Sequence, residues 1–124
     1  MNLQGVMTMS NQIQVITVAT GEMPVLRPNW EYSHENMNKA VGGWLEAVRV
    51  SETVVLWINE EGQINDLPVN FFLLDSSENP INRIHGNVIF TGLDEAGSTV
   101  GLKPEDIELI ERRFVNRAGF VHYK

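Results

Sequence analysis

Short stretches in which hydrophobic and polar residues alternate recur along the chain, and this period of two predicts β-strands. Ser51 and Glu52 link two such stretches as a hairpin, and a tight turn at residues 59–62 leads into the next one. The predicted strands cover residues 12–19, 44–50, 53–59, 63–67 and 86–92. The pattern therefore indicates an antiparallel sheet of about five strands.

Other stretches are less regular. Residues 23–30 contain Pro24 and Pro28, which favour an extended connector or an edge segment over a central strand. Residues 68–74 end in an apolar run whose periodicity fits a buried helix as well as a buried strand. Residues 75–82 are polar and predict a loop.

Two segments carry helix signals. Ser33 is a suitable N-cap, Glu35 complements the dipole of the first turn, and Gly42 can take the left-handed position that ends a helix over 34–41. Pro104 begins a second helix over 104–116, in which apolar side chains recur at helical spacing. The expected fold class is α+β, with two helices packed on one side of the sheet.

Composition agrees with a globular fold. The chain has 124 residues, of which 43% are hydrophobic and 20% charged, and this length predicts one domain. We assign that domain to residues 12–117. A flexible tail is predicted at residues 1–11 because the stretch has no periodicity, and a short basic tail at 118–124.

Charge and cysteine content limit which binding partners and which cellular compartment we expect. The formal net charge is -7, so neither DNA binding nor binding to an anionic membrane is expected. The chain contains no cysteine, which fits a reducing compartment. No apolar run could span a bilayer, and the first 11 residues do not resemble a secretion signal. We expect a soluble, intracellular protein.

Catalytic motifs are missing from the sequence. No nucleophile elbow or phosphate-binding loop is present, and the adjacent Glu60 and Glu61 are typical of a solvated turn. His34, His85 and His122 are scattered, without the spacing of metal ligands. The sequence therefore predicts a protein that is not an enzyme and has no cofactor and no metal.

Basic residues gather near the end of the chain, at Arg112, Arg113, Arg117 and Lys124. One interpretation is that these cations complement the dipole at the end of the second helix. The other is an anion site, because arginine side chains bind phosphate through two parallel hydrogen bonds. The sequence leaves both open.

Aromatic residues are the second group of candidate binding residues. Trp44 and Trp57 lie in apolar stretches and are predicted to be core residues. Trp30 and Tyr32 lie among polar neighbours and are predicted to be exposed, where they could stack on a base. Asn70, directly before two phenylalanines, is expected to be a local cap or a ligand contact.

An ordered series of short motifs resembles a family of small domains of unknown function. The motifs are VGGWLE at 41–46, NEEG at 59–62, LPVN at 67–70, HGN at 85–87 and LKPEDI at 102–107. The resemblance extends over about residues 13–114. Such domains are encoded mostly by bacteriophages and mobile elements, so the resemblance implies a viral origin, and it carries no assigned activity.

Viral origin and missing catalytic motifs favour action by binding. The first hypothesis is a counter-defence sponge that sequesters a cyclic or other signalling nucleotide made by the host. Aromatic rings would stack on the bases, amides would read base edges and arginines would hold phosphates. The candidate ligand-binding residues are Trp30, Tyr32, Asn59, Asn70, Arg112, Arg113 and Arg117.

The alternatives are an acidic inhibitor or adaptor that binds a host protein, as nucleic-acid mimics do, and a structural or regulatory phage protein. A short chain has little interior for a pocket, so we expect a homodimer or higher oligomer with the site at the interface. Residues 12–19 or 68–74 could pair as exposed strands across a twofold axis.

Overall fold

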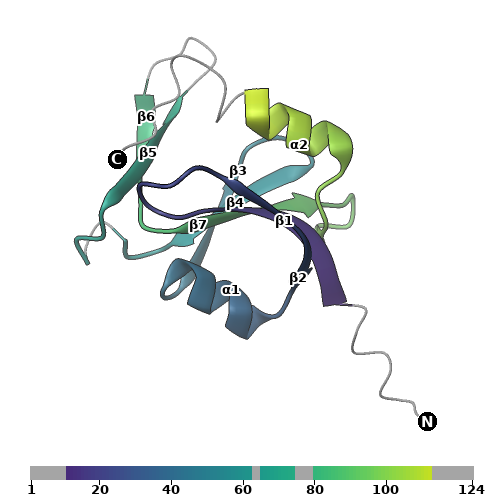
Figure 1. The fold of residues 1–124 in the computed structure, drawn as a ribbon, viewed down its shortest axis with the longest axis horizontal. Helices are drawn as coiled ribbons and strands as arrows, with labels where there is room; N and C mark the ends of the chain where they lie inside the picture. Colours follow the sequence, from purple (N-terminus) through teal and green to yellow (C-terminus); the bar gives the residue numbers. More distant parts are fainter. Residues whose placement is uncertain (1–10, 63–64, 75–79, 113–124) are drawn as a thin grey trace.

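The computed structural model describes residues 11–62, 65–74 and 80–112, and its main element is a six-stranded antiparallel sheet (Figure 1). The strand order is β2-β1-β7-β4-β3, with β8 paired to β7. These strands are β1 (Gln12–Val18), β2 (Val25–Glu31), β3 (Leu45–Arg49), β4 (Val54–Asn59), β7 (Val88–Leu93) and β8 (Thr99–Val100). The predicted α+β class and the antiparallel sheet are confirmed.

A second, two-stranded sheet stands beside the first. It is the hairpin of β5 (Val69–Leu74) and β6 (Pro80–His85). Residues 68–74, which the sequence left between helix and strand, are therefore mostly strand. The predicted loop at 75–82 is shorter than expected because β6 begins at Pro80.

Both faces of the main sheet are apolar. Along β7, Val88 and Phe90 point to one face and Ile89 to the other, since side chains alternate along a strand. The first face carries the α2-face cluster, which is Ile16, Val18, Val54, Leu56, Phe71, Ile84, Val88, Phe90, Leu102 and Ile110. The second face carries the smaller α1-face cluster, which is Val15, Met37, Val41 and Ile89.

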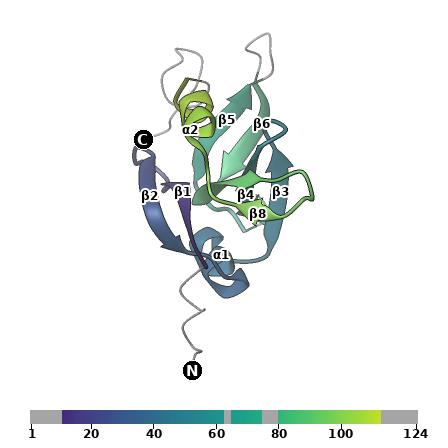
Figure 2. The ribbon, with the colours of Figure 1, turned by 90° about the vertical axis from the view of Figure 1, so that its right-hand side faces the viewer.

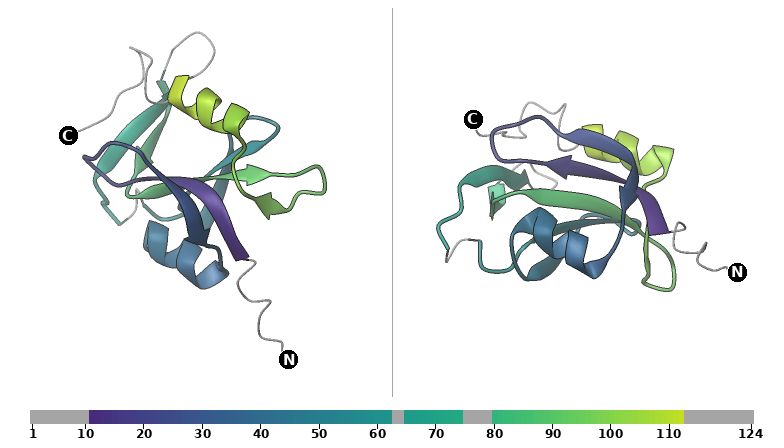
Figure 3. Two further views of the ribbon diagram at one scale, coloured as in Figure 1. Left: turned by 45° about the vertical axis from the view of Figure 1, so that its right-hand side comes forward. Right: turned by 60° about the horizontal axis from the view of Figure 1, so that its bottom comes forward.

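The two helices lie on opposite faces of the sheet, so the prediction that both pack on one side is wrong. Helix α1 (His34–Val41) contributes Met37 and Val41 to one cluster, and α2 (Pro104–Ile110) contributes Ile110 to the other. Figures 1 and 2 and the left view of Figure 3 all place α1 and α2 on opposite sides of the sheet. A sheet with two apolar faces needs a cover on each.

Local signals set the ends of α1 where the sequence predicted them. The Ser33 hydroxyl accepts a hydrogen bond of 3.0 Å from the Asn36 amide, which is the N-cap bond. At the other end Gly42 has φ 81°, a left-handed conformation that a residue with a Cβ adopts only under strain. Residues 34–41 are therefore helical, as predicted.

Helix α2 is held at its start by Asp106, which is buried. One carboxylate oxygen accepts from the Lys103 amide at 2.9 Å, and the other accepts from the Thr53 hydroxyl at 2.6 Å. The helix thus begins at Pro104, as predicted, and runs to Ile110. Residues 113–116 of the predicted helix lie outside the described residues.

Two predictions about strands are corrected. Residues 65 and 66 form a turn in which Asp66 has φ 54°, and Leu67 belongs to no strand, so the strand predicted over 63–67 is wrong for its described part. Residues 63 and 64 lie outside the described residues. Strand β1 is hydrogen-bonded to β2 on one side and to β7 on the other, so it cannot pair with a second copy. The edge position predicted for residues 23–30 is taken by β2.

Both predicted tails fall almost wholly outside the described residues, which begin at Asn11 and end at Arg112. Their boundaries therefore stay predictions. Among the described residues, none belongs to a helix long and apolar enough to cross a membrane.

Candidate functional site

The two asparagines proposed as ligand contacts are buried and engaged with the backbone. Asn59, at the end of β4, donates to the Val41 carbonyl at 3.2 Å and accepts from the Glu61 amide at 2.8 Å. These bonds tie the end of α1 to the turn after β4. Asn59 therefore acts as a connection between elements in this structure.

Asn70 has no exposed surface at all. Its amide nitrogen donates to the Val18 carbonyl at 3.0 Å and to the Gly86 carbonyl at 2.8 Å. The side chain thus joins β1, β5 and the turn between β6 and β7. Its amide oxygen has no hydrogen-bond partner among the described residues. These bonds are not those of the local cap that the sequence suggested, because the partners are 52 and 16 residues away in the chain.

The predictions about which tryptophans are buried are partly wrong. Trp44 has 67% of its surface exposed, so the prediction that it is a core residue is wrong. It precedes β3, which is an edge strand, and none of the described elements covers it there. Trp57 packs against the α1-face cluster, in line with the core prediction. Its indole nitrogen donates to the Thr91 hydroxyl at 2.8 Å.

Trp30 and Tyr32 are half-buried, so the prediction that they are an exposed pair is also wrong. Both pack against the α1-face cluster. The reason is the path of the chain, since β2 leads directly into α1 and the helix folds across the same face. The polar residues beside Trp30 and Tyr32 in the sequence give no indication of this packing.

The arginines are only partly described. Arg112 is exposed just beyond α2, while Trp30 and Tyr32 pack on the opposite face of the sheet. Arg113 and Arg117 lie outside the described residues. Within the described residues, the predicted ligand contacts are therefore not brought together in one place.

An open groove runs along the edge strand β2, with a volume of about 310 Å³. We call it the β2 groove, and its lining residues are Leu26, Arg27, Pro28, Asn29 and Trp30. Opposite Trp30 lies Ile13, and opposite Arg27 lies Val15, with a shift of register between the two pairs. Ile13 and Val15 lie on the same face of β1. The shift of register therefore places the side chains of Trp30 and Arg27, which are three residues apart in the chain, on one face.

Arg27 is exposed, and its Nε donates to the Thr17 hydroxyl at 3.0 Å. No carboxylate of the described residues forms an ion pair with it. The two terminal nitrogens of the guanidinium have no hydrogen-bond partner among the described residues. Sequence reasoning missed Arg27 and Asn29, although the run Arg27-Pro28-Asn29-Trp30 places three recognition groups within four residues.

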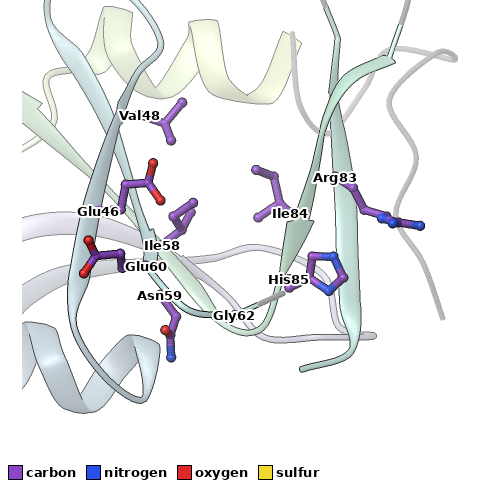
Figure 4. A pocket seen from close by; sticks show the side chains of 9 residues that line it. All are labelled: Glu46, Val48, Ile58, Asn59, Glu60, Gly62, Arg83, Ile84 and His85. Carbon is purple, nitrogen blue, oxygen red and sulfur yellow. The ribbon is translucent and has the colours of Figure 1, made fainter. Parts of the chain in front are cut away.

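A smaller cavity of about 180 Å³ lies at the opposite edge of the sheet, between β3–β4 and β6 (Figure 4). We call it the β3 cavity, and its lining residues are Glu46, Val48, Ile58, Asn59, Glu60, Gly62, Arg83, Ile84 and His85. In Figure 4 the Ile84 side chain points toward β3 and β4, whereas those of Arg83 and His85 point the other way. The carboxylates of Glu46 and Glu60 both belong to the β3–β4 wall.

His85 is held by the turn before β5. Its Nδ1 lies 2.8 Å from the Leu67 carbonyl, and a carbonyl can only accept, so Nδ1 carries the hydrogen. The Nε2 atom is buried and has no hydrogen-bond partner in the part of the chain that the structure describes. Since the ring points away from the cavity, this nitrogen does not serve it.

A larger hollow of about 800 Å³ lies near the turn between β7 and β8. This turn projects from the fold in Figure 3. Arg49 and Lys103 line it together with Glu52, Asp94 and Glu95. Its cations are offset by carboxylates, and it has no aromatic residue. Among the described residues, no three His, Asp or Glu side chains gather to hold a metal ion.

The chain belongs to the family described as DUF3846, a domain of unknown function. The family model matches residues 13–115, which is most of the chain. This confirms the resemblance to a family of small domains of unknown function. No curated protein and no solved structure matches the chain.

Proposed function

We propose that the protein is a binding protein and not an enzyme, and that it sequesters a cyclic or other signalling nucleotide. In the setting that we propose, a bacteriophage or mobile element encodes it and it counters host defence in the host cytoplasm. One observation carries the proposal, namely that an indole, a guanidinium and a primary amide line one open groove, at Trp30, Arg27 and Asn29.

Each of these groups matches one part of a nucleotide. The Trp30 ring offers an aromatic surface for a base, and stacking of this kind contributes about 1–3 kcal/mol per base. The free terminal nitrogens of Arg27 suit two oxygens of a phosphate. The amide of Asn29 can both donate to and accept from a base edge.

The overall charge of -7 opposes an anionic ligand. Salt weakens this opposition, because charges farther apart than about 8 Å are largely screened at physiological ionic strength. A guanidinium in direct contact with a phosphate is much less screened. Local chemistry in the β2 groove therefore outweighs the net charge.

We further propose that the protein is a homodimer or higher oligomer in which a second copy covers the groove. Strand β2 lies at the edge, and Met23, Val25 and Leu26 beside the groove are exposed apolar residues. Pro28 lacks an N–H group and disfavours a continuous sheet across the two copies. The contact would thus use side chains. Light scattering at micromolar concentration tests it, and a monomeric mass would contradict it.

The nucleotide is tested by thermal shift and calorimetry with cyclic di- and trinucleotides and ADP-ribose derivatives. A ligand at one hundred times its Kd stabilises the folded protein by about 2.7 kcal/mol. Arg27→Gln should weaken binding at least about tenfold, because a hydrogen bond to a charged group contributes about 1.5–3 kcal/mol.

Arg49→Gln is the matched control, since Arg49 is also an exposed strand arginine but lies on β3. It should bind nucleotide as the unaltered protein does. A panel in which no nucleotide raises the melting temperature would refute the proposal, and so would equal binding by the Arg27 and Arg49 variants.

The second candidate function is an inhibitor or adaptor that binds a host protein. The observation that favours it is the same exposed apolar stretch, in which Met23, Val25 and Leu26 are 60%, 41% and 46% exposed. Neighbouring apolar side chains in water are typical of protein interfaces. Leu26→Asp would abolish capture of such a partner while leaving the fold intact.

A further inference from the structure

The β3 cavity has an apolar floor. Val48 and Ile58, from the two strands of the β3–β4 wall, pack against the α2-face cluster, to which Ile84 of the opposite wall belongs. A volume of about 180 Å³ corresponds to roughly six water molecules at about 30 Å³ each. A chain of four carbons with one polar head group would fill it.

Two glutamates of the β3–β4 wall line this cavity, and in Figure 4 the Glu46 carboxylate points toward Ile84 whereas that of Glu60 points the opposite way. In the β3–β4 register Glu46 lies opposite Ile58, and Glu60 follows two residues later along the same strand direction. Neither carboxylate has an ion pair or a side-chain hydrogen bond with any of the described residues. The one guanidinium of the lining, that of Arg83, points away from the cavity (Figure 4). The negative charge at this site is therefore not neutralised from within.

Trp44 lies at the same edge of the sheet, directly before β3, although it is not one of the residues that line the cavity. Its carbonyl accepts a hydrogen bond of 2.8 Å from the Glu60 amide, which continues the β3–β4 ladder by one position. Because side chains alternate along a strand, this register puts residue 44 on the side of Glu46 and Val48. With 67% of its surface exposed, Trp44 is the most exposed of the large hydrophobic residues described.

We propose that the β3 cavity binds a primary alkylammonium group, with the ammonium at the Glu46 carboxylate and the alkyl stem on Val48, Ile58 and Ile84, while Glu60 and Trp44 flank the site at the same edge. Carboxylates attract the cation, and the face of an indole attracts it as well. The stem removes apolar surface from water. This site goes beyond the proposed nucleotide function, because it takes a cation and lies at the other edge of the sheet.

The test uses the full-length protein, labelled with ¹⁵N, and follows amide and indole chemical shifts during titration. The probes are n-butylammonium, 1,4-diaminobutane and N-acetyl-lysine amide, with 1-butanol as the neutral control of equal chain length. We expect the three cations to shift Trp44, Glu46 and Ile84 in a saturable way. Butanol should not.

Glu46→Gln and Glu60→Gln keep the shape of the side chain and remove its charge. Glu46→Gln should weaken binding of n-butylammonium about fivefold, the upper end for an ion pair open to solvent, and Glu60→Gln should weaken it less because its carboxylate points away from the cavity. Trp44→Leu should weaken it about twofold to fivefold, as loss of an exposed cation–π contact does. Glu52→Gln, an exposed glutamate in the β3–β4 turn, is the matched control and should change nothing.

The same titration separates two sources of the group. Tighter binding of 1,4-diaminobutane than of N-acetyl-lysine amide identifies a free diamine as the ligand class. The reverse order identifies a lysine side chain of a partner protein. No saturable shift with any cation at millimolar concentration would overturn the proposal, as would equal shifts with butanol or unchanged binding in the Glu46→Gln and Glu60→Gln variants.

The result is independent of the nucleotide proposal. Glu46→Gln should leave nucleotide binding in the β2 groove unchanged, and Arg27→Gln should leave ammonium binding unchanged. Failure at one edge therefore cannot be mistaken for failure at the other.

Discussion

The two edges of the main sheet carry similar residue types with opposite charge. At the β2 edge a tryptophan, Trp30, shares a groove with the guanidinium of Arg27. At the β3 edge a tryptophan, Trp44, is bonded through its carbonyl to Glu60, whose side chain lines a cavity with that of Glu46. The first edge suits an anion with a ring, and the second suits a cation with an alkyl stem.

The edges also differ in how firmly each tryptophan is held. Trp30 packs against the α1-face cluster, whereas Trp44 is largely exposed. A net charge of -7 agrees in sign with the β3 edge but not with the guanidinium at the β2 edge. The comparison teaches that ligand chemistry in a small domain follows the charges within a few ångströms of a site, since more distant charges are screened.

The largest expected effect is a loss of stability on removing a core side chain that supports the β3 edge more than the β2 edge. Phe71 has no exposed surface and belongs to the α2-face cluster, on the hairpin that forms one wall of the β3 cavity. Phe71→Ala should lower the free energy of unfolding by about 3–5 kcal/mol, measured by urea denaturation. In the folded variant, ammonium binding should weaken more than nucleotide binding.

Phe72→Ala is the control for that change, because Phe72 is adjacent on β5 but half-buried. It should cost clearly less stability. Equal losses for the two variants would mean that the hairpin is not anchored through Phe71.

A change of intermediate size compares the two tryptophans. Trp30→Ala should lower the free energy of unfolding by about 1–3 kcal/mol, less than for a fully buried side chain because Trp30 is half-buried. Trp44→Ala should change it by no more than about 0.5 kcal/mol, as surface substitutions usually do. Thermal and urea unfolding give both values, and a larger loss for Trp44 than for Trp30 would reverse the comparison.

The smallest effect on stability comes from reversing the charge of each edge. Arg27→Glu and Glu46→Lys should each change the free energy of unfolding by no more than about 0.5 kcal/mol, because both side chains are exposed. Binding should respond strongly, with nucleotide lost in the first variant and ammonium in the second. If either variant lost both ligands, the two edges would not be separate sites.

Elements with strong local signals could be predicted from the sequence. Ser33 and Gly42 define the ends of α1 through bonds and dihedral angles that involve neighbouring residues, so the predicted 34–41 helix agrees with the structure. The hairpin of β3 and β4 could also be predicted, because the alternation along its strands and the turn between them are local features of the sequence. The strand over 63–67 was wrong because its described part holds a turn at residues 65 and 66, in which Asp66 has a positive φ.

The candidate sites could be predicted only in part. Trp30 was identified as a ligand contact and does line a groove, but the groove also needs Arg27, which a register shift against β1 brings to the same face. Asn70 was identified as unusual, yet its partners at Val18 and Gly86 are 52 and 16 residues away in the chain. Such distant partners leave no local pattern.

By itself, the sequence determined the fold class, most of the strands and the α1 helix, because alternation, caps and turns act between residues close along the chain. The tertiary structure decided which faces the helices cover, which tryptophan is exposed and which charges meet at each edge of the sheet. These outcomes depend on strand order and register, in which contacts form between residues far apart in the chain.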